Sequence, residues 1–336
     1  MVLETERLIL RPWQIEDAGD LYEYARDPEV GPIAGWPPHQ NIEESRQVIQ
    51  NVFMVPECFA LCLKENGRTV GTIQLKLKGH TDMTDREDEC ELGYWLGKPL
   101  WGQGLMPEAV QEILRHAFED LGMCKVWCGY YDGNDRSKRV QEKCGFRYQW
   151  TTENVEVPLM QETRRGHVNC LTREEWITNR KRDAQIEQLL EKPWWIMDIL
   201  PVQVPAGAQG QYSAVERYFL QPEQKSALYR KYAHILMKLN CYYDLEVSFD
   251  AGDSWQKNPD PEDFADKLTQ LSGRGYLRVL IESSGTMMDL DTGDTWMTIY
   301  DPSPEILELL CKLAGSEGLF IWKPENHQDR GVDYGS

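Results

Sequence analysis

Residues 89–110 read ECELGYWLGKPLWGQGLMPEAV, and they carry more information about the fold than any other segment of the chain. Its first eight residues have the composition of a strand, two glycines follow at positions 102 and 104, and apolar residues then recur at helical spacing as far as Leu121. Glycine lets a backbone approach a phosphate closely, and the first turn of a helix offers it unpaired N–H groups. The strand–loop–helix order therefore predicts an anion cradle. Taken alone, the loop also fits a plain connection between a strand and a helix.

The segments around this stretch predict a mixed α/β unit. The pair Asn66-Gly67 between two apolar runs is typical of a hairpin, so the preceding strands should be antiparallel. A Walker loop is excluded because no Gly-Lys-Ser/Thr follows, and a dinucleotide fingerprint is excluded because the third glycine is missing. We expect strands at 7–11, 58–64, 69–77, 89–96 and 125–131 and in a pair over 146–171, and helices at 16–25, 42–52, 106–121 and 135–144.

Five segments in order carry a family resemblance. They are ERLILRPW with the following EDA, GWPPH, ELGYWLGKPLWGQGLMPEA, NDRSKRVQEKCGF and VNCLTREEW. Together they resemble the GNAT superfamily of N-acetyltransferases, and within it the branch of the ribosomal-protein N-terminal acetyltransferases. The resemblance covers about residues 3–177. It implies the GNAT fold, with a central, mostly antiparallel, splayed sheet flanked by helices.

The resemblance implies acetyl-CoA as co-substrate and no metal. The strand at 91–96 would pair its backbone with the pantetheine arm, the amides of 102–106 would hold the pyrophosphate, and Asn134 would bind near the pantetheine. Pro99 departs from the Gln or Arg usual in the family at that position. The implied cofactor residues are Leu92, Gly93, Tyr94, Trp95, Leu96, Gly102, Gln103, Gly104, Leu105, Met106 and Asn134.

Amine acetylation requires a proton acceptor for the amine, a donor for the oxyanion and an acid for the departing thiolate. Glu91 is the first candidate base, and a salt-bridged strand residue is the alternative reading. By the resemblance, Ser137 would protonate the thiolate; otherwise it supports the start of its helix. A backbone amide near residues 92–94 is the expected oxyanion donor.

Trp36 and His39 would line the acceptor pocket, as their loop does in the family; the two prolines between them could equally serve only to stiffen a surface loop. The formal net charge of −19 disfavours nucleic acid and favours a cationic amine, either a peptide N-terminus or a small molecule such as an aminoglycoside or polyamine, although an acidic surface can equally serve only solubility. His116, in mid-helix among apolar neighbours, fits packing better than catalysis.

The length of 336 residues predicts two domains. We assign 1–177 to the acetyltransferase domain, 178–192 to a helical linker, 193–325 to a smaller second α/β domain of unknown role and 326–336 to a flexible tail. Homodimer formation is open. In the second domain we expect strands at 195–204, 212–220, 242–249, 276–282, 295–300 and 319–322 and helices at 222–239, 261–271 and 304–314.

Two motifs in the second domain are weak. The run Asp289-Leu-Asp-Thr-Gly-Asp294 loosely resembles a calcium loop but lacks the distal Glu. The run QLSGRG at 270–275 fits the Gln-x-x-Gly-x-Gly pattern, but a helix precedes it and a strand follows, so an αβ turn explains it better.

Nine scattered cysteines without a CxxC pair give no zinc pattern and indicate reduced thiols. No signal peptide or apolar run long enough for a membrane span is visible, so we expect a cytoplasmic protein. The leading hypothesis is an N-acetyltransferase. The alternative is a non-catalytic CoA-binding sensor or scaffold whose second domain carries the function.

Overall fold

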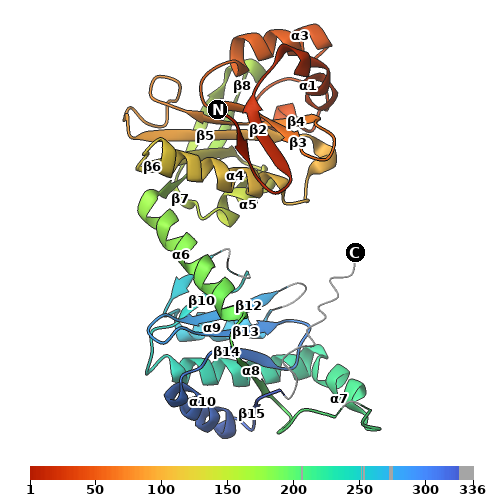
Figure 1. The fold of residues 1–336 in the computed structure, drawn as a ribbon, viewed down its shortest axis with the longest axis vertical. Coiled ribbons are helices and arrows are strands. Elements are labelled where there is room, and N and C mark those ends of the chain that lie inside the picture. Colours follow the sequence, from red (N-terminus) through yellow and green to blue (C-terminus); the bar gives the residue numbers. More distant parts are fainter. Residues whose placement is uncertain (206, 251, 253, 272–274, 325–336) are drawn as a thin grey trace. The chain divides into compact units, whose positions relative to one another are not determined.

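A computed structural model describes the chain except residues 206, 251, 253, 272–274 and 325–336 (Figure 1). The chain forms two compact units, Met1–Asn179 and Arg180–Ser336, and the division falls inside helix α6 (Arg173–Leu190). The tail expected at 326–336 lies outside the described residues. None of the described helices is both long enough and apolar enough to cross a membrane.

The first unit is built on one mixed sheet. Its strands lie in the order β1-β2-β3-β4-β5-β6-β8-β7, and every neighbouring pair is antiparallel except β5 and β6. This confirms the predicted mostly antiparallel sheet. The strands are β1 (Leu3–Glu4), β2 (Leu8–Pro12), β3 (Cys58–Leu63), β4 (Thr69–Lys76), β5 (Glu89–Leu96), β6 (Lys125–Tyr131), β7 (Arg147–Val157) and β8 (Glu162–Thr172).

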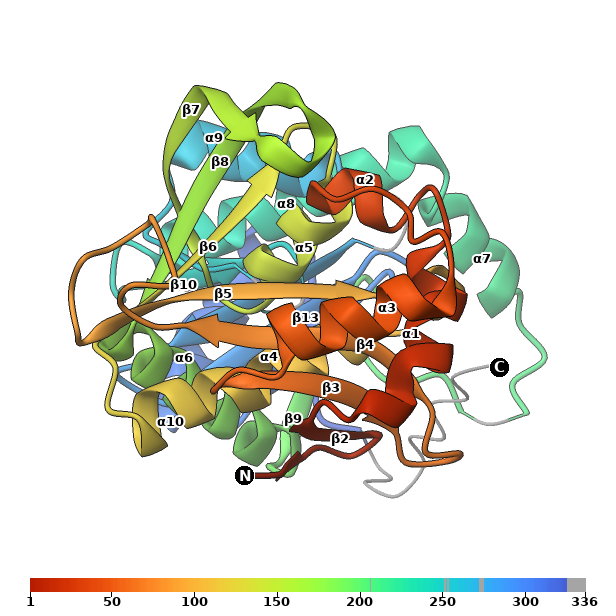
Figure 2. The same cartoon turned by 90° about the horizontal axis from the view of Figure 1, so that it is seen from above.

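Helices cover both faces of this sheet: α1 and α3 lie on the side opposite α4 (Figures 1 and 2). The core-facing residues of α4, such as Ala109, Val110 and Ile113, are fully buried, because apolar side chains recur every three or four positions. Single π turns extend α3 over Ile49–Phe53 and α4 over His116–Asp120. The helices are α1 (Ala18–Ala25), α2 (Gly31–Ala34), α3 (Ile42–Val48), α4 (Leu105–Arg115) and α5 (Asp135–Lys143).

His116 lies in the second π turn and is fully buried. Its Nδ1 is 2.9 Å from Asp120 Oδ2, and its Nε2 is 2.8 Å from Glu57 Oε2. Both ring nitrogens are therefore used inside the fold, in agreement with the packing role expected for this residue.

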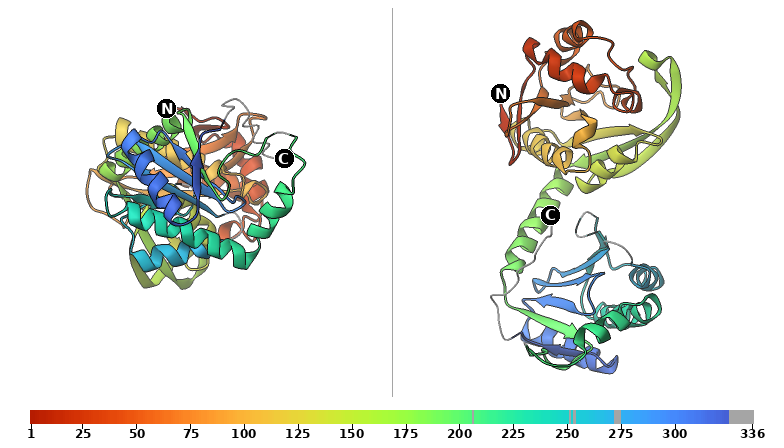
Figure 3. Two further views of the ribbon diagram at one scale, coloured as in Figure 1. Left: turned by 90° about the horizontal axis from the view of Figure 1, so that it is seen from below. Right: turned by 90° about the vertical axis from the view of Figure 1, so that its right-hand side faces the viewer.

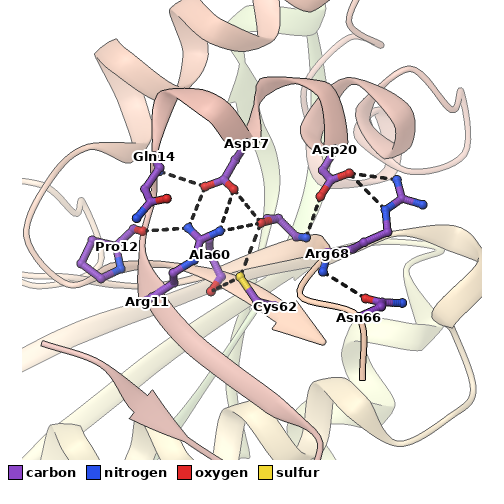
Figure 4. A network of polar contacts seen from close by, with 10 residues as sticks. Arg11, Pro12, Gln14, Asp17, Asp20, Ala60, Cys62, Asn66 and Arg68 are labelled. Atoms are coloured by element: carbon purple, nitrogen blue, oxygen red, sulfur yellow. Dashed lines mark hydrogen bonds and ion pairs between the residues drawn. The ribbon is translucent and has the colours of Figure 1, made fainter. Parts of the chain in front are cut away.

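An ion-pair network fixes the entry into α1 against the sheet (Figure 4). Both Oδ atoms of Asp17 accept hydrogen bonds from the guanidinium of Arg11, each at 2.7 Å, and Oδ1 also accepts from Thr69 at 3.0 Å. Burial opposes ionisation of Asp17, but these hydrogen bonds and one from the backbone of Gln14 outweigh it and lower its pKa. The ionised carboxylate therefore stabilises the fold.

Replacing Asp17 with Asn is expected to lower the free energy of unfolding by about 2 kcal/mol near neutral pH, because an amide cannot accept both guanidinium donors. Since folding lowers this pKa, the contribution is present above the usual value of 3.8 and is lost as the pH falls through the folded value. Urea unfolding at several pH values measures the difference. The more exposed Glu23, changed to Gln, is the control. A difference that stays constant into the acidic range would contradict the account.

The second unit is built on an antiparallel sheet. Its strands lie in the order β11-β10-β12-β13-β14-β9-β15. The strands are β9 (Trp194–Asp198), β10 (Glu246–Ser248), β11 (Gln256–Lys257), β12 (Tyr276–Ile281), β13 (Thr286–Asp291), β14 (Met297–Tyr300) and β15 (Phe320–Trp322), and the helices are α7 (Tyr212–Phe219), α8 (Pro222–Leu239), α9 (Pro261–Thr269) and α10 (Pro304–Ser316).

Helices α8, α9 and α10 pack on one face of this sheet (Figure 3). Alternate strand residues such as Met197, Leu277 and Ile299 point into that core, together with Tyr232 and Leu310 from the helices. The side chains at the intervening strand positions therefore lie on the opposite face.

One strand predicted for this unit is wrong, and strands β11 and β13 were not predicted. The strand expected at 212–220 is helix α7, because Tyr212, Val215 and Phe219 recur at helical rather than alternating spacing. The weak resemblance of residues 289–294 to a calcium loop finds no support, because Asp289 lies within β13 and forms an ion pair with Arg278. Helix α9 precedes and β12 follows the 270–275 run, as expected, although 272–274 lie outside the described residues.

Candidate active site

Strands β5 and β6 run side by side for only half of their length. Their parallel pairing joins Glu89–Leu92 to Lys125–Cys128 and ends there, although β5 continues to Leu96 and β6 to Tyr131. Beyond that point β5 still pairs with β4, and β6 still pairs with β8. The two strands therefore part, and among the described residues no strand pairs with the β6-facing edge of β5 over 93–96.

One cavity of about 420 Å³ lies between the outer half of β5, the glycine loop and the starts of α4 and α5; we call it the glycine-loop cavity. Of the residues expected to hold the cofactor, Leu92 and Gly93 are not in its lining, and neither is Gln103, whose amide group turns away to Pro99 at 3.0 Å. Those in the lining are Tyr94, Trp95, Leu96, Gly102, Gly104, Leu105, Met106 and Asn134.

The glycine loop has the backbone conformation that the sequence indicates. Gly102 and Gly104 have φ values of +78° and +77°, which L-residues rarely adopt, and α4 begins at the next residue, Leu105. The guanidinium of Arg7 holds the loop by donating to the carbonyl of Gln103 at 2.8 Å, and it also pairs with Glu108 in the first turn of α4. The loop is thus held in place at the N-terminal end of the helix.

Sequence reasoning missed the positive side of this cavity. Arg136, Arg139 and Lys143 of α5 all line it, and the guanidinium carbon of Arg136 lies 4.2 Å from the centre of the Trp101 ring. Their spacing of three and four residues puts them on one face of a helix, so the pattern could have been recognised in the sequence. Together with the amides at the start of α4, these cations suit a phosphate-bearing ligand.

The point where the strands part carries a hydrogen-bonded pair of hydroxyls. The hydroxyl oxygen of Tyr94 lies 3.0 Å from Ser137 Oγ and 3.2 Å from the Ser137 carbonyl oxygen. Burial raises the pKa of Tyr94 well above its usual value, which keeps the phenol protonated. Both residues line the glycine-loop cavity and also a second cavity on the other side.

Ser137 is held by a buried chain that the sequence did not reveal. Gln141 donates from Nε2 to Ser137 Oγ at 3.2 Å, and Asn169 donates to Gln141 Oε1 at 2.8 Å. Gln141 is fully buried and Asn169 nearly so. The side-chain oxygen of Asn134 accepts a hydrogen bond from the backbone N–H of Ser137 at 3.2 Å and so caps the N-terminus of α5. Its side-chain nitrogen is the group that could bind a ligand.

The second cavity, of about 690 Å³, lies against the hairpin of β7 and β8; we call it the hairpin cavity. Glu91, Leu92, Gly93 and Trp36 line it. One carboxylate oxygen of Glu91 accepts from Lys76 at 2.6 Å and the other from Thr81 at 2.5 Å. The salt-bridged arrangement of Glu91 that the sequence left open is therefore present, at a position that still borders the cavity.

Trp36 stands between the cavity and His39. Its ring centre lies 5.7 Å from that of Trp95 and 5.4 Å from that of His39. His39 is buried, its Nδ1 lies 2.8 Å from Ser45 Oγ, and burial lowers its pKa, which keeps the ring neutral. In the described chain, Trp36 lines the hairpin cavity, whereas His39 lines neither cavity. His39 therefore contacts Trp36 without bordering the cavity itself.

One buried donor at this site lacks a partner. Within the described chain, the indole N–H of Trp95 makes no hydrogen bond, although its side chain is buried and lines both cavities. An unsatisfied buried N–H costs free energy, so such a group is commonly used by a ligand. The unpaired edge of β5, this N–H and the positive wall of α5 together fit an extended, polar, phosphate-bearing cofactor.

One group of side chains in the described chain could hold a metal ion, and it lies outside both cavities. It consists of Asp88, Glu89 and Cys124. Both carboxylates are already engaged: Arg86 pairs with Asp88 at 2.6 Å and with Glu89 at 3.1 Å, and Trp127 donates to Glu89 at 2.6 Å. The group therefore fits an ion-pair cluster at the start of β5.

These features form a site that suits an extended anionic cofactor in the opening of a parted sheet, and residues of this site also line a second cavity. Comparisons with known proteins agree. The acetyltransferase (GNAT) domain family matches residues 7–147. The chain is 30% identical over 151 residues to the uncharacterized N-acetyltransferase p20 of Bacillus licheniformis, covering 43% of this chain and 82% of that one.

Two further known proteins are similar to parts of this chain. The chain is 33% identical over 97 residues to the FsC-acetyl coenzyme A-N(2)-transacetylase of Aspergillus fumigatus, covering 29% of this chain and 41% of that enzyme. Among solved structures, the ribosomal-protein-S5-alanine acetyltransferase of Vibrio fischeri aligns with a TM-score of 0.43 and 17% identity, over 52% of this chain and 98% of that one. The chain belongs to the GNAT family and is an N-acetyltransferase.

Proposed function

We propose that this enzyme transfers an acetyl group from acetyl-CoA to a primary amine by direct attack, without an acyl-enzyme. The observation that carries the proposal is the parting of β5 from β6 after Leu92, which leaves the backbone of 93–96 open to pair with an extended pantetheine arm as with an added strand. The name of the Aspergillus relative, which includes acetyl coenzyme A, supports this choice of donor.

The phosphates of the cofactor would lie in the glycine-loop cavity. There the amides of residues 102–106 and the side chains of Arg136, Arg139 and Lys143 offer donors and positive charge. The thioester would then reach the junction of the two cavities. Tyr94 and Ser137, which line both, would lie beside its sulfur, and Trp95 would contribute its indole N–H.

We assign protonation of the departing thiolate to Ser137, supported by Tyr94. The Ser137 oxygen accepts from Gln141, and its own hydrogen can turn from the Tyr94 oxygen toward the sulfur. As the serine gives its hydrogen to the sulfur, Tyr94 can pass its phenol proton to the serine oxygen, and water in the hairpin cavity, which Tyr94 lines, would return a proton to the phenol. The oxyanion of the tetrahedral intermediate would take a backbone N–H of β5 near residues 92–94.

The amine would approach through the hairpin cavity. Asp82, Glu91 and Glu156 give this cavity acidic groups, while Trp36 and Trp150 give it aromatic surface, a combination that suits a cationic acceptor. Lys76 forms an ion pair with Glu91 at 2.6 Å. We propose that Glu91 receives the amine proton through a water molecule, since both of its oxygens are already hydrogen bonded.

We further propose that the protein works in the cytoplasm. No disulfide joins its nine cysteines, all of which lie in the described chain, and most of them are buried. Unpaired buried thiols suit a reducing compartment. Cell fractionation that recovers the protein outside the cytoplasm would contradict this.

The reaction is tested with the purified chain, acetyl-CoA and a panel of amines covering N-terminal peptides, aminoglycosides and polyamines. We expect acceptor-dependent release of the CoA thiol, fastest with a cationic acceptor, and a lower kcat for Glu91→Gln. If acetyl-CoA binds but no amine releases thiol, the proposed substrate class fails. If Glu91→Gln leaves kcat unchanged at every pH, Glu91 only forms the ion pair with Lys76.

A further inference from the structure

A third cavity lies wholly in the second unit, on the sheet face that α8, α9 and α10 leave open; we call it the sheet-face cavity. Its volume is about 880 Å³. Strand register places Trp322, Ile196, Thr298 and Asp289 in one row across β15, β9, β14 and β13, on the face opposite the helical core. The residues of this row all line the cavity.

Aromatic side chains make up much of its wall. Three tryptophans and three tyrosines contribute, from β9, β12, β14, β15, the start of α7 and the segment before β14. Part of this ring set is fixed by hydrogen bonds, since Trp322 donates to the carbonyl of Leu200 at 3.1 Å. The aromatic residues are Trp194, Trp296, Trp322, Tyr212, Tyr276 and Tyr300.

The charged groups of the wall are all acidic. Asp198, Asp289, Asp291 and Asp294 line the cavity, and no Lys, Arg or His is present among its described wall residues. One of these charges is compensated from behind, because Arg278 donates to both oxygens of Asp289, at 2.9 and 2.8 Å.

Asp198 differs from Asp289 in the groups that surround its carboxylate. Its side chain is only 5% exposed, and its carboxylate accepts the backbone N–H of Ile199 at 2.6 Å. Among the described residues no basic side chain forms an ion pair with it, and burial raises its pKa despite hydrogen bonds from two backbone amides. A buried carboxylate without a cation is costly, and a cationic ligand in the cavity would supply the missing charge.

We propose that the sheet-face cavity is a binding site for an organic cation, a small molecule that carries one or more ammonium groups. Aromatic faces attract such a cation through their quadrupoles, and the carboxylates pair with its ammonium groups. A bare metal ion suits this wall less, because it would require several oxygen ligands around one point, whereas no three of the described carboxylates of this wall come close enough together to hold one. The inference does not rest on the acetylation reaction.

Titration calorimetry of the full chain with spermine, with tobramycin and with the neutral sugar maltose tests the proposal. We expect both cations to bind and maltose not to bind. Asp198→Asn and Trp296→Leu should each weaken cation binding about tenfold. Asp266→Asn is the matched control, because it removes one carboxylate of the same unit at an exposed position outside the cavity.

Two variants keep the test decisive. If Asp198→Asn unfolds, as circular dichroism would show, Trp296→Leu still reports on the cavity from a half-buried position. Cation affinity that is equal in both cavity variants and the control would place binding elsewhere and overturn the proposal. It would also be overturned if neither cation binds, or if maltose binds as well as they do.

Discussion

Replacement of Ser137 with Ala is expected to lower kcat about a hundredfold, with little change in the affinity for acetyl-CoA. Its hydroxyl is the proposed acid at the junction of the two cavities and is held there by Gln141. Tyr94→Phe should have a similar effect, because it removes the phenol that lies 3.0 Å from the same oxygen. Single-turnover kinetics measure the chemical step apart from product release.

The two residues should act as a unit. We therefore expect the double variant to be about as slow as either single variant, rather than slower by the product of the two effects. Tyr148→Phe is the matched control, because it removes a phenol hydroxyl from the exposed face of β7. Full activity of Ser137→Ala, or independent multiplying effects, would show that the hydroxyl pair does not protonate the thiolate.

A valine at position 102 is expected to weaken acetyl-CoA binding by at least about tenfold. Gly102 has a φ of +78°, which a β-branched residue resists, and it borders the glycine-loop cavity. Any relaxation of the loop would move the amides that are proposed to hold the phosphates. Equilibrium binding to the purified variant measures the effect.

Gly122→Val provides the control for backbone strain. Gly122 has a similar φ of +70°, and like Gly102 it has open space where a Cβ would stand, but it follows α4 outside both cavities. Both variants should lose about 2 kcal/mol of stability, and only Gly102→Val should lose cofactor affinity. Equal affinity in the two variants would mean that the glycine loop does not hold the cofactor.

Local patterns predicted most of the first unit. The bounds of β5 and β6 match the expected strands, and the positive φ angles at Gly102 and Gly104 match the expected loop. The parting of the strands came from the family resemblance, because nothing in a single strand's composition shows where its pairing with another strand ends.

Contacts between distant segments could not be predicted in this way. The chain from Asn169 through Gln141 to Ser137 joins β8 to α5, and the Lys76 pairing of Glu91 joins β4 to β5. Neither leaves a periodic signal. In the second unit, β13 was missed because its aspartates suggested a loop, whereas Asp289 is neutralised by Arg278 on the neighbouring strand.

A crystal structure of the complex with acetyl-CoA would show where the cofactor binds. We expect the pantetheine arm between β5 and β6, hydrogen bonded to the backbone of residues 93–96, with the pyrophosphate at the amides of 102–106 and the sulfur beside Ser137. A cofactor bound outside the opening between these two strands, with the backbone of 93–96 still unpaired, would contradict the account.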